Sequence, residues 1–328
     1  MKTINSWRQL PGYMLGACIA LVAAGAFAQQ NYPTRTVRLV VPSSPGGGTD
    51  ITARILAPRL SEYLGQQVIV ENRPGAGTMI GGEAVARAAP DGYTLLMGIS
   101  TLAINPAIYK KVPYDAIRDL APISQAVALS NVLVTHPSLP PRTLREFIAF
   151  AKARPGQLNF ASAGVGTSPH LSFELFLVMT GLKITHIPYK GSGPGVVDLV
   201  AGHVPMMMPN MLSAQPHIKA GRLRALGVTG TKRASGAEDI PTIAEAGVPG
   251  YEAVQWYGVL APAATPRDII TRLHGQVVRA LQSEDVKKRL QTDGADPVGS
   301  SPEQFAAFLR AETDKWARVV KAAGIKQE

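Results

Sequence analysis

Cysteine is almost absent from this chain, since Cys18 is the only one in 328 residues. Lys2 and Arg8 precede an apolar run that closes on small residues, a pattern typical of a secretory signal peptide over 1–28 that is cleaved after Ala28. Cleavage would remove Cys18, so we expect an exported, periplasmic protein without disulfides. The roughly 300 residues that remain are enough to bury a stabilising core.

A second interpretation of the same segment stays open. Residues 15–18, which read Leu-Gly-Ala-Cys, resemble a lipoprotein cleavage box, and cleavage there would leave a lipid-anchored Cys18. In either case no later stretch approaches about 18 uninterrupted apolar residues. We therefore predict no membrane-spanning helix in the mature chain.

Clustered charge and the common catalytic motifs are missing as well. The formal charge is +10, or +8 without Lys2 and Arg8, but the basic residues do not cluster with aromatics, so we expect no nucleic-acid partner. The six histidines form no H-x-x-x-H or H-E-x-x-H pair, and no G-x-S-x-G elbow or phosphate-loop spacing occurs. We expect no metal, no cofactor and no enzymatic activity, and a small anion as the ligand.

Apolar runs and helix-like periods alternate through most of the chain. The predicted strands are 37–41, 68–70, 94–97, 132–135, 158–161, 184–187, 204–208, 223–228 and an apolar segment at 256–261. The predicted helices are 50–64, 80–88, 144–153, 171–179, 196–201, one around Ile218, 267–281, 285–290 and 302–323. This alternation predicts an α/β protein whose parallel sheets are covered by helices.

The order of these elements indicates two α/β lobes followed by a helical C-terminal tail. We expect the chain to cross between the lobes twice, near 126–133 and near 252–257. Lobe 1 would then contain 29–130 plus 255–328, and lobe 2 would contain 131–254. In such sheets, ligands bind at the loops beyond the carboxyl ends of the strands.

Four strand–helix junctions are rich in glycine and hydroxyl side chains, at 41–50, 72–78, 98–101 and 162–168. Backbone N–H groups at a helix start favour anions, and glycine lets a ligand approach them closely. Such neutral donors bind a carboxylate without a buried counter-charge. At the first junction, a tight turn with Thr49 or Asp50 as the helix cap is the other interpretation.

Other residues allow different functions. Ser168 and His170 would be the nucleophile and base of an exported hydrolase, although residues two apart point to different faces of a helix. Trp256 and Tyr257, near the second crossing, would close over a ligand or simply be buried. Residues 206–208, three methionines, would form a soft ligand wall, a copper site or ordinary core.

Several long segments of the mature chain match one known family in order and spacing. They read VPSSPGGGTDITAR (41–54), VENRPGAGTMIG (70–81), APDGYTLLMG (89–98), SAGVGTSPHLSFELF (162–176), HIPYKGSGPGVVDLVAGHV (186–204) and PTIAEAGVPGYEAVQWYGVLAPAATP (241–266). Through them the chain resembles the substrate-binding receptors of the tripartite tricarboxylate transporters, also called TctC or Bug receptors.

The resemblance implies a two-lobed type II periplasmic-binding-protein fold, or Venus flytrap. Such a receptor captures a small organic carboxylate between its lobes and delivers it to a membrane transporter, and a monomer suits that task. A sensory binding module with the same fold is an alternative. Together the junctions and the resemblance give the candidate ligand-binding residues Ser43, Ser44, Gly47, Gly48, Thr49, Gly77, Thr78, Ser100, Thr101, Gly166, Thr167, Ser168 and Asn210.

One departure from the family pattern concerns the ligand. Pro209 stands where relatives often carry an aspartate. Without that carboxylate the pocket is less acidic, and the amino group of a ligand loses a partner. We therefore expect a plain organic acid rather than an amino acid.

Overall fold

The structure, a computed structural model, describes residues 32–322. The predicted signal peptide and its cleavage position lie outside the described residues. Within 32–322 no helix combines the length and the apolar character needed to cross a membrane.

Short runs of branched apolar residues form the centre of a six-stranded sheet with the order β11-β4-β10-β3-β1-β2. Its strands are β1 (Val37–Val41), β2 (Val68–Asn72), β3 (Thr94–Ile99), β4 (Leu120–Ser130), β10 (Val254–Pro262) and β11 (Ala295–Pro297). β1 lies parallel to β2 and β3, whereas β10, β4 and β11 join in antiparallel pairs. All six positions of β3 are buried, as expected for a strand covered on both faces.

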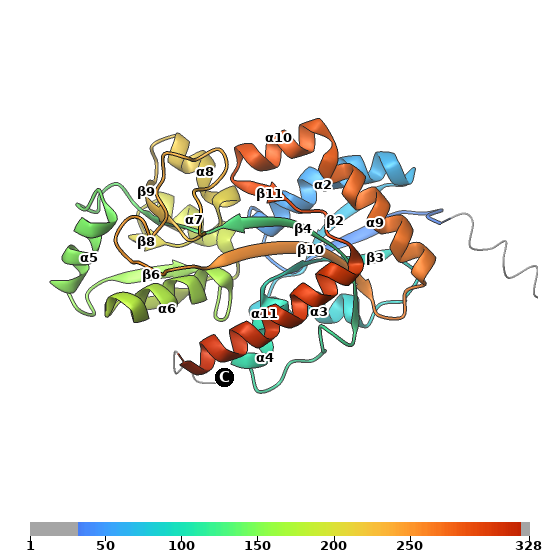
Figure 1. Cartoon of the computed structure of the whole chain (residues 1–328), viewed down its shortest axis with the longest axis horizontal. Helices are drawn as coiled ribbons and strands as arrows, with labels where there is room; N and C mark the ends of the chain where they lie inside the picture. Colours follow the sequence, from blue (N-terminus) through green and yellow to red (C-terminus); the bar gives the residue numbers. More distant parts are fainter. Residues whose placement is uncertain (1–31, 323–328) are drawn as a thin grey trace, which may run out of the picture.

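Helices cover both faces of this sheet (Figure 1). They are α2 (Gly48–Leu64), α3 (Met79–Ala86), α4 (Thr101–Ile108), α9 (Arg267–Gln282), α10 (Glu284–Thr292) and α11 (Pro302–Ala322), with the short 3-10 turn η1 (Ala76–Thr78) before α3. Leu56 of α2 and Leu273 of α9 pack in one core cluster, while Val85 of α3 and Phe305 of α11 pack in the other. In α9, buried Ile269, Leu273 and Val277 recur every four residues, so one stripe of the helix faces the sheet.

A second sheet has five strands in the order β7-β6-β8-β5-β9. They are β5 (Val132–Thr135), β6 (Asn159–Ser162), β7 (Thr185–Pro188), β8 (Met206–Met207) and β9 (Arg224–Val228). Its helices are α5 (Leu144–Lys152), α6 (Ser168–Thr180), α7 (Ser192–Val200) and α8 (Met211–Lys219). Phe147 of α5 and Phe173 of α6 pack in one cluster, and Leu199 of α7 and Met211 of α8 in another, so this sheet also has two covered faces.

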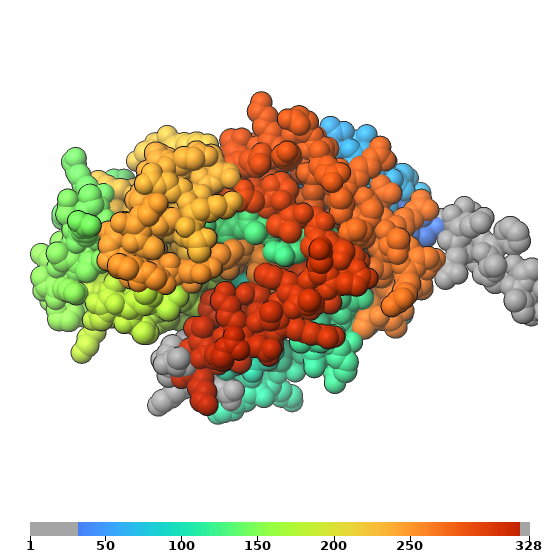
Figure 2. All heavy atoms as spheres, in the orientation of Figure 1, coloured from blue at the N-terminus to red at the C-terminus, as the bar shows by residue number. Residues whose placement is uncertain are grey.

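The chain passes between the two sheets where the sequence predicts the crossings. It leaves the six-stranded sheet at the end of β4 and enters β5 after Asn131, and it returns at Val254, the start of β10. β4 and β10 are paired along their length and reach toward the smaller sheet (Figure 1). A small groove of about 90 Å³, lined in part by Ser130 and Val254, lies over these crossings, and the surface there is hollowed beside α11 (Figure 2).

Three elements and one short turn were not predicted: α4, β4, the three-residue β11 and the 3-10 turn η1. The first two show why. α4 contains Pro106, and a proline inside a helix normally argues against one. β4 contains Pro122 and the polar Ser124 and Gln125, which interrupt its apolar pattern, yet it pairs with β10 on one side and β11 on the other. In both cases tertiary packing overrides the local signal.

Four residues suggested as ligand contacts belong to the core. Met206, Met207 and Met208 are fully buried, and they belong to the clusters on the two faces of the smaller sheet. Trp256 is also buried, and its indole Nε1–H donates to Glu312 of α11 over 3.3 Å. The suggestion that Trp256 closes over a ligand is therefore wrong, because its side chain is held on the α11 side of the sheet.

Candidate ligand-binding site

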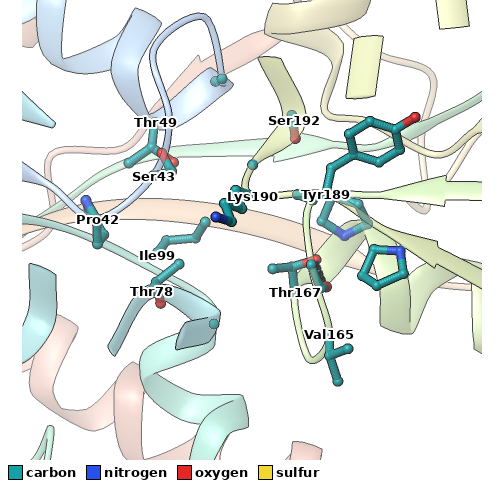
Figure 3. A pocket seen from close by; sticks show the side chains of 18 of the residues that line it. Pro42, Ser43, Thr49, Thr78, Ile99, Val165, Thr167, Tyr189, Lys190 and Ser192 are labelled. Atoms are coloured by element: carbon teal, nitrogen blue, oxygen red, sulfur yellow. Dashed lines mark hydrogen bonds between the residues drawn. The ribbon is translucent and has the colours of Figure 1, made fainter. Parts of the chain in front are cut away.

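A cavity of about 270 Å³ lies between the two sheets, at the carboxyl ends of five strands, β1, β2, β3, β6 and β7. Residues that follow β1 and end β3 line one side, and residues that follow β6 and β7 line the other (Figure 3). This is the place where open α/β sheets bind ligands. The volume is just below the usual range for small-molecule pockets, about 300–1,000 Å³, so it suits a small ligand.

Most of the candidate residues predicted from the sequence line this cavity. Those that do are Ser43, Gly47, Gly48, Thr49, Gly77, Thr78, Thr167 and Asn210. Those that do not are Ser44, Ser100, Thr101, Gly166 and Ser168, which lie beside or behind the lining residues.

The loop between β1 and α2 brings neutral donors to the cavity. Gly47 is the N-cap of α2, so the first N–H groups of a 17-residue helix face the cavity from Gly48 and Thr49. The hydroxyl of Ser43 is buried and has no hydrogen-bonding partner within the described part of the chain. The hydrogen-bonding capacity of this hydroxyl is therefore left unused by the protein itself.

The same loop is held by its own carboxylate. Asp50 accepts hydrogen bonds from the Gly46 N–H, from Arg54 and from the Asn72 side chain. Burial alone would raise the pKa of Asp50, but these hydrogen bonds outweigh burial and lower it. Asp50 does not line the cavity, so its charge supports the loop rather than repelling an anion.

The second loop is shaped from behind by α4. The Asn105 side-chain amide donates to the Gly77 carbonyl at 3.0 Å, and the Thr78 and Thr101 hydroxyls are hydrogen-bonded to each other. Thr78 has φ of 77°, a left-handed conformation that costs energy in a residue with a Cβ. Thr101 thus acts through Thr78, which is the residue that lines the cavity.

Two predicted ligand contacts are instead tied to the crossings. The Ser100 hydroxyl donates to Gln255 at 2.7 Å, and the Asn131 amide donates to the Ser168 hydroxyl at 2.8 Å. Asn131 and Gln255 lie at the first and second crossing. Both serines are buried and outside the lining of the cavity, so their hydroxyls link helix starts to the crossings.

The suggested hydrolase pair is not assembled. The Ser168 hydroxyl is engaged by Asn131, while His170 Nδ1 accepts the Gly166 N–H at 3.2 Å. The other ring nitrogen of His170 faces Glu174 at 3.6 Å. His170 therefore supports the loop at 164–167, and Ser168 lacks the adjacent base that a nucleophile needs.

The sequence reasoning missed the loop after β7, which contributes Tyr189, Lys190, Gly191 and Ser192 to the cavity. Its K-G-S-G-P run, which leads into the first turn of α7, has the same glycine-rich form as the other junctions, and that signal could have identified it. Gln255 and Tyr257 of β10 also line the cavity.

Tyr257 supplies a neutral hydroxyl at the floor of the cavity. Burial raises its pKa to about 12, although hydrogen bonds with Gln255 and Thr49 oppose the shift. The phenol therefore stays protonated at physiological pH. Among the lining residues Lys190 is the one with a full charge, and none carries a carboxylate.

Contacts on two sides of the cavity join its walls. The Ser44 hydroxyl donates to the Lys190 carbonyl, and the Tyr109 hydroxyl donates to the Val165 carbonyl at 3.3 Å. A Cβ added at Gly48 would lie less than 3.0 Å from Asn210 Oδ1 and the Tyr257 hydroxyl. The walls thus meet closely, and glycine at 48 permits the approach.

Two α/β units joined by paired strands, with a cavity between them, define the class of the molecule as a periplasmic binding protein. A model of the tripartite tricarboxylate transporter family receptor, TctC, matches residues 52–325. The chain belongs to this family of solute-binding receptors, which confirms the predicted family and two-lobed α/β fold.

Individual relatives agree with this assignment. Protein BugT of Bordetella pertussis is 42% identical over 316 residues, which are 95% of this chain and 97% of that protein. The solved structure of R. palustris Rpa4515 with adipate is 40% identical, with a TM-score of 0.88, and the match covers 90% of this chain and 100% of that one. MatC (Rpa3494) from Rhodopseudomonas palustris with bound malate is 33% identical, with a TM-score of 0.82, over 88% and 100% of the two chains.

A pair of stacked histidines supports the lining loop at 164–167 and generates a prediction. The rings of His186 and His170 are 4.0 Å apart, and His186 Nε2 is 2.6 Å from the Ser162 hydroxyl. Burial and then the neighbouring His170 lower the pKa of His186 to about 3. The folded protein therefore keeps His186 neutral at pH values where the unfolded chain, with a pKa near 6.5, takes up a proton.

We expect this histidine to destabilise the fold in acid. Its contribution is present above about pH 6.5 and is lost as the pH falls toward 3, because only the unfolded state binds the proton. Between pH 7 and pH 4 the free energy of unfolding should fall by about 2 kcal/mol more in the wild type than in His186→Gln. Urea titrations at several pH values measure this difference.

The matched control is His203→Gln, because the side chain of His203 is 71% exposed. That variant should follow the wild-type pH dependence. An unchanged pH dependence in His186→Gln would contradict the assignment of the acid sensitivity to His186.

Proposed function

We propose that this protein is a periplasmic receptor that binds a small organic carboxylate between its two lobes and delivers it to its membrane transporter. The observation that carries the proposal is the lining of the cavity. Backbone N–H groups at the start of α2, the hydroxyls of Ser43 and Tyr257, and one lysine face it, and no carboxylate does. Such a set of donors attracts an anion and offers nothing to a cation.

The relatives point in the same direction, since the structures of Rpa4515 and MatC carry adipate and malate. The ligand-binding residues of this chain would be the candidates that line the cavity. Lobe 1 would contain 29–130 plus 255–328 and lobe 2 would contain 131–254, after cleavage of the signal peptide behind Ala28. We further propose that the receptor works as a monomer, with no enzymatic activity.

A plain organic acid fits the cavity better than an amino acid. Pro209 does not line the cavity, and the Asn210 side chain accepts the Ser213 N–H as the N-cap of α8. No lining residue supplies a negative charge for a ligand ammonium group. A receptor selective for amino acids would need such a partner.

We expect the two lobes to close when the ligand binds. In a two-lobed receptor the contacts made by both lobes favour the closed form, and the transporter recognises that form. Here the 43–49 segment belongs to one side of the cavity, and the 163–167 and 189–192 segments belong to the other. An acid bound to both sides would stabilise the walls in contact.

The proposed function is tested by a thermal-shift and calorimetry screen of residues 29–328 against mono-, di- and tricarboxylic acids, aromatic acids and amino acids. A ligand at about one hundred times its Kd adds about 2.7 kcal/mol to the free energy of unfolding, which raises Tm by several degrees. We expect a shift with one class of carboxylates and none with amino acids. Tight binding of amino acids, or of none of the acids, would overturn the proposal.

Ser43 provides a sharper test of the site. Because its hydroxyl is buried, unpartnered and in the lining, Ser43→Ala should weaken the best acid of the screen by about 0.5–1.5 kcal/mol. This corresponds to about a twofold to twelvefold higher Kd in calorimetry. The free energy of unfolding without ligand should change little, since no internal hydrogen bond is lost.

Ser168→Ala is the matched control, because Ser168 is a predicted contact that lies outside the lining and is bonded to Asn131. It should lower the stability and leave Kd within about twofold. The reverse result, a loss of affinity in Ser168→Ala and none in Ser43→Ala, would contradict the placement of the site.

A further inference from the structure

Lys190 brings the one full charge into a cavity otherwise lined by neutral groups. It follows β7 and lines the cavity, and its side chain extends into the cavity in the close-up view (Figure 3). The residue is exposed, and within residues 32–322 its ammonium has no ion-pair partner. The charge is thus directed at the space that the ligand would occupy and is not neutralised by the protein.

The backbone of this loop is fixed on both sides of Lys190. The Lys190 carbonyl accepts the Ser44 hydroxyl from the opposite wall. The Tyr189 hydroxyl donates to Asp198 of α7 at 2.7 Å, and the Tyr189 ring points away from the cavity (Figure 3). Because Tyr189 is anchored outward and the Lys190 carbonyl is held by Ser44, the Lys190 side chain points into the cavity.

The position of Lys190 depends on close packing between its own loop and the loop on the opposite wall of the cavity. A Cβ added at Gly191 would lie 3.0 Å from the Ser44 side chain, and one at Gly193 would overlap the Pro45 carbonyl. The loop carrying Lys190 therefore sits directly against the loop that starts α2. An acid held by the donors of Ser43 and Thr49 would share the cavity with the Lys190 side chain.

We propose that Lys190 binds a second anionic group of the ligand, and that it makes the receptor select dianionic over monoanionic acids. This inference rests on the proposed function, because it assumes that a first carboxylate is held by the α2 side of the cavity. The two carboxylates of the ligand would then be bound by two different kinds of group, neutral hydrogen-bond donors at one end and the Lys190 ammonium at the other. A solvated surface lysine is the alternative, and it predicts no such selectivity.

The experiment uses six-carbon acids that differ only at the far end: hexanedioate, hexanoate and 6-aminohexanoate. Butanedioate and butanoate test the same contrast at a shorter length. Calorimetry measures Kd for the wild type, for Lys190→Met and for Lys190→Glu. Lys183→Met, which removes an exposed lysine outside the lining of the cavity, is the matched control.

The wild type should bind the better dianion about tenfold or more tightly than the monoanion of the same length. Lys190→Met should lose about tenfold for the dianion and less than twofold for the monoanion. Lys190→Glu should weaken the dianion further and improve 6-aminohexanoate relative to the wild type. Added salt should reduce the wild-type preference, because the ammonium is exposed.

Three results overturn the inference while the proposed function stands. Equal losses for dianion and monoanion in Lys190→Met would show that the residue acts through closure alone. Unchanged affinities would show a solvated lysine, and equal losses in Lys183→Met would show a general charge effect. If no acid of the wider screen binds the wild type, the proposed function falls together with this inference.

Discussion

The arrangement of the cavity depends on the close contact between two glycine-rich loops, 43–48 on one side and 189–193 on the other. Ser44 bonds to the Lys190 carbonyl, and Gly193 lies against the Pro45 carbonyl. Gly48 is packed just as tightly, because a Cβ there would overlap the side chains of Asn210 and Tyr257. Because these contacts leave no room for a Cβ, the glycines set how near the two walls come and so how small the cavity is.

Neutral donors explain how such a small cavity could hold a charge. An ionised side chain buried beside the ligand would lose its hydration, and that loss would offset much of the attraction. The starts of α2, α6 and α7 all face the cavity, through Thr49, Thr167 and Ser192. Their backbone donors are already ordered by the helices, so binding costs little reorganisation.

The crossings couple the cavity to the fold. Asn131 and Gln255 lie where the chain passes between the sheets, and their amides bond to Ser168 and Ser100 at two helix starts. A change in the relative position of the sheets would move these helix starts together with the crossings. The hydroxyls of the two serines therefore belong to the mechanical support of the site.

The sequence predicted the architecture well and the site in part. The apolar runs identified most strands, including β1 and β5 with their full bounds, and the glycine-rich junctions identified the α2 start. Ser100 and Ser43 look alike in sequence, since each hydroxyl follows a strand and precedes a helix. Only the tertiary structure shows that the Ser100 hydroxyl is used by Gln255, whereas Ser43 lines the cavity and its hydroxyl has no partner in the described residues.

Long side chains are harder to place from a pattern. Lys190 stands in a motif that the sequence shows plainly, yet its direction depends on Ser44, which bonds to its carbonyl from the opposite wall, and on Asp198, which anchors the neighbouring Tyr189. In the same way, α4 is missed because Pro106 is tolerated in it once α11 packs alongside. Local chemistry gives the kinds of groups at the site, and the packing of the two sheets selects among them.

The most direct test of the account is a crystal structure of residues 29–328 with the tightest-binding acid of the screen. We predict walls in contact and one carboxylate within hydrogen-bonding distance, about 2.7–3.2 Å, of the Ser43 hydroxyl and the N–H groups at the start of α2. An acid bound elsewhere, or a carboxylate in this cavity that contacts none of these donors, would contradict it.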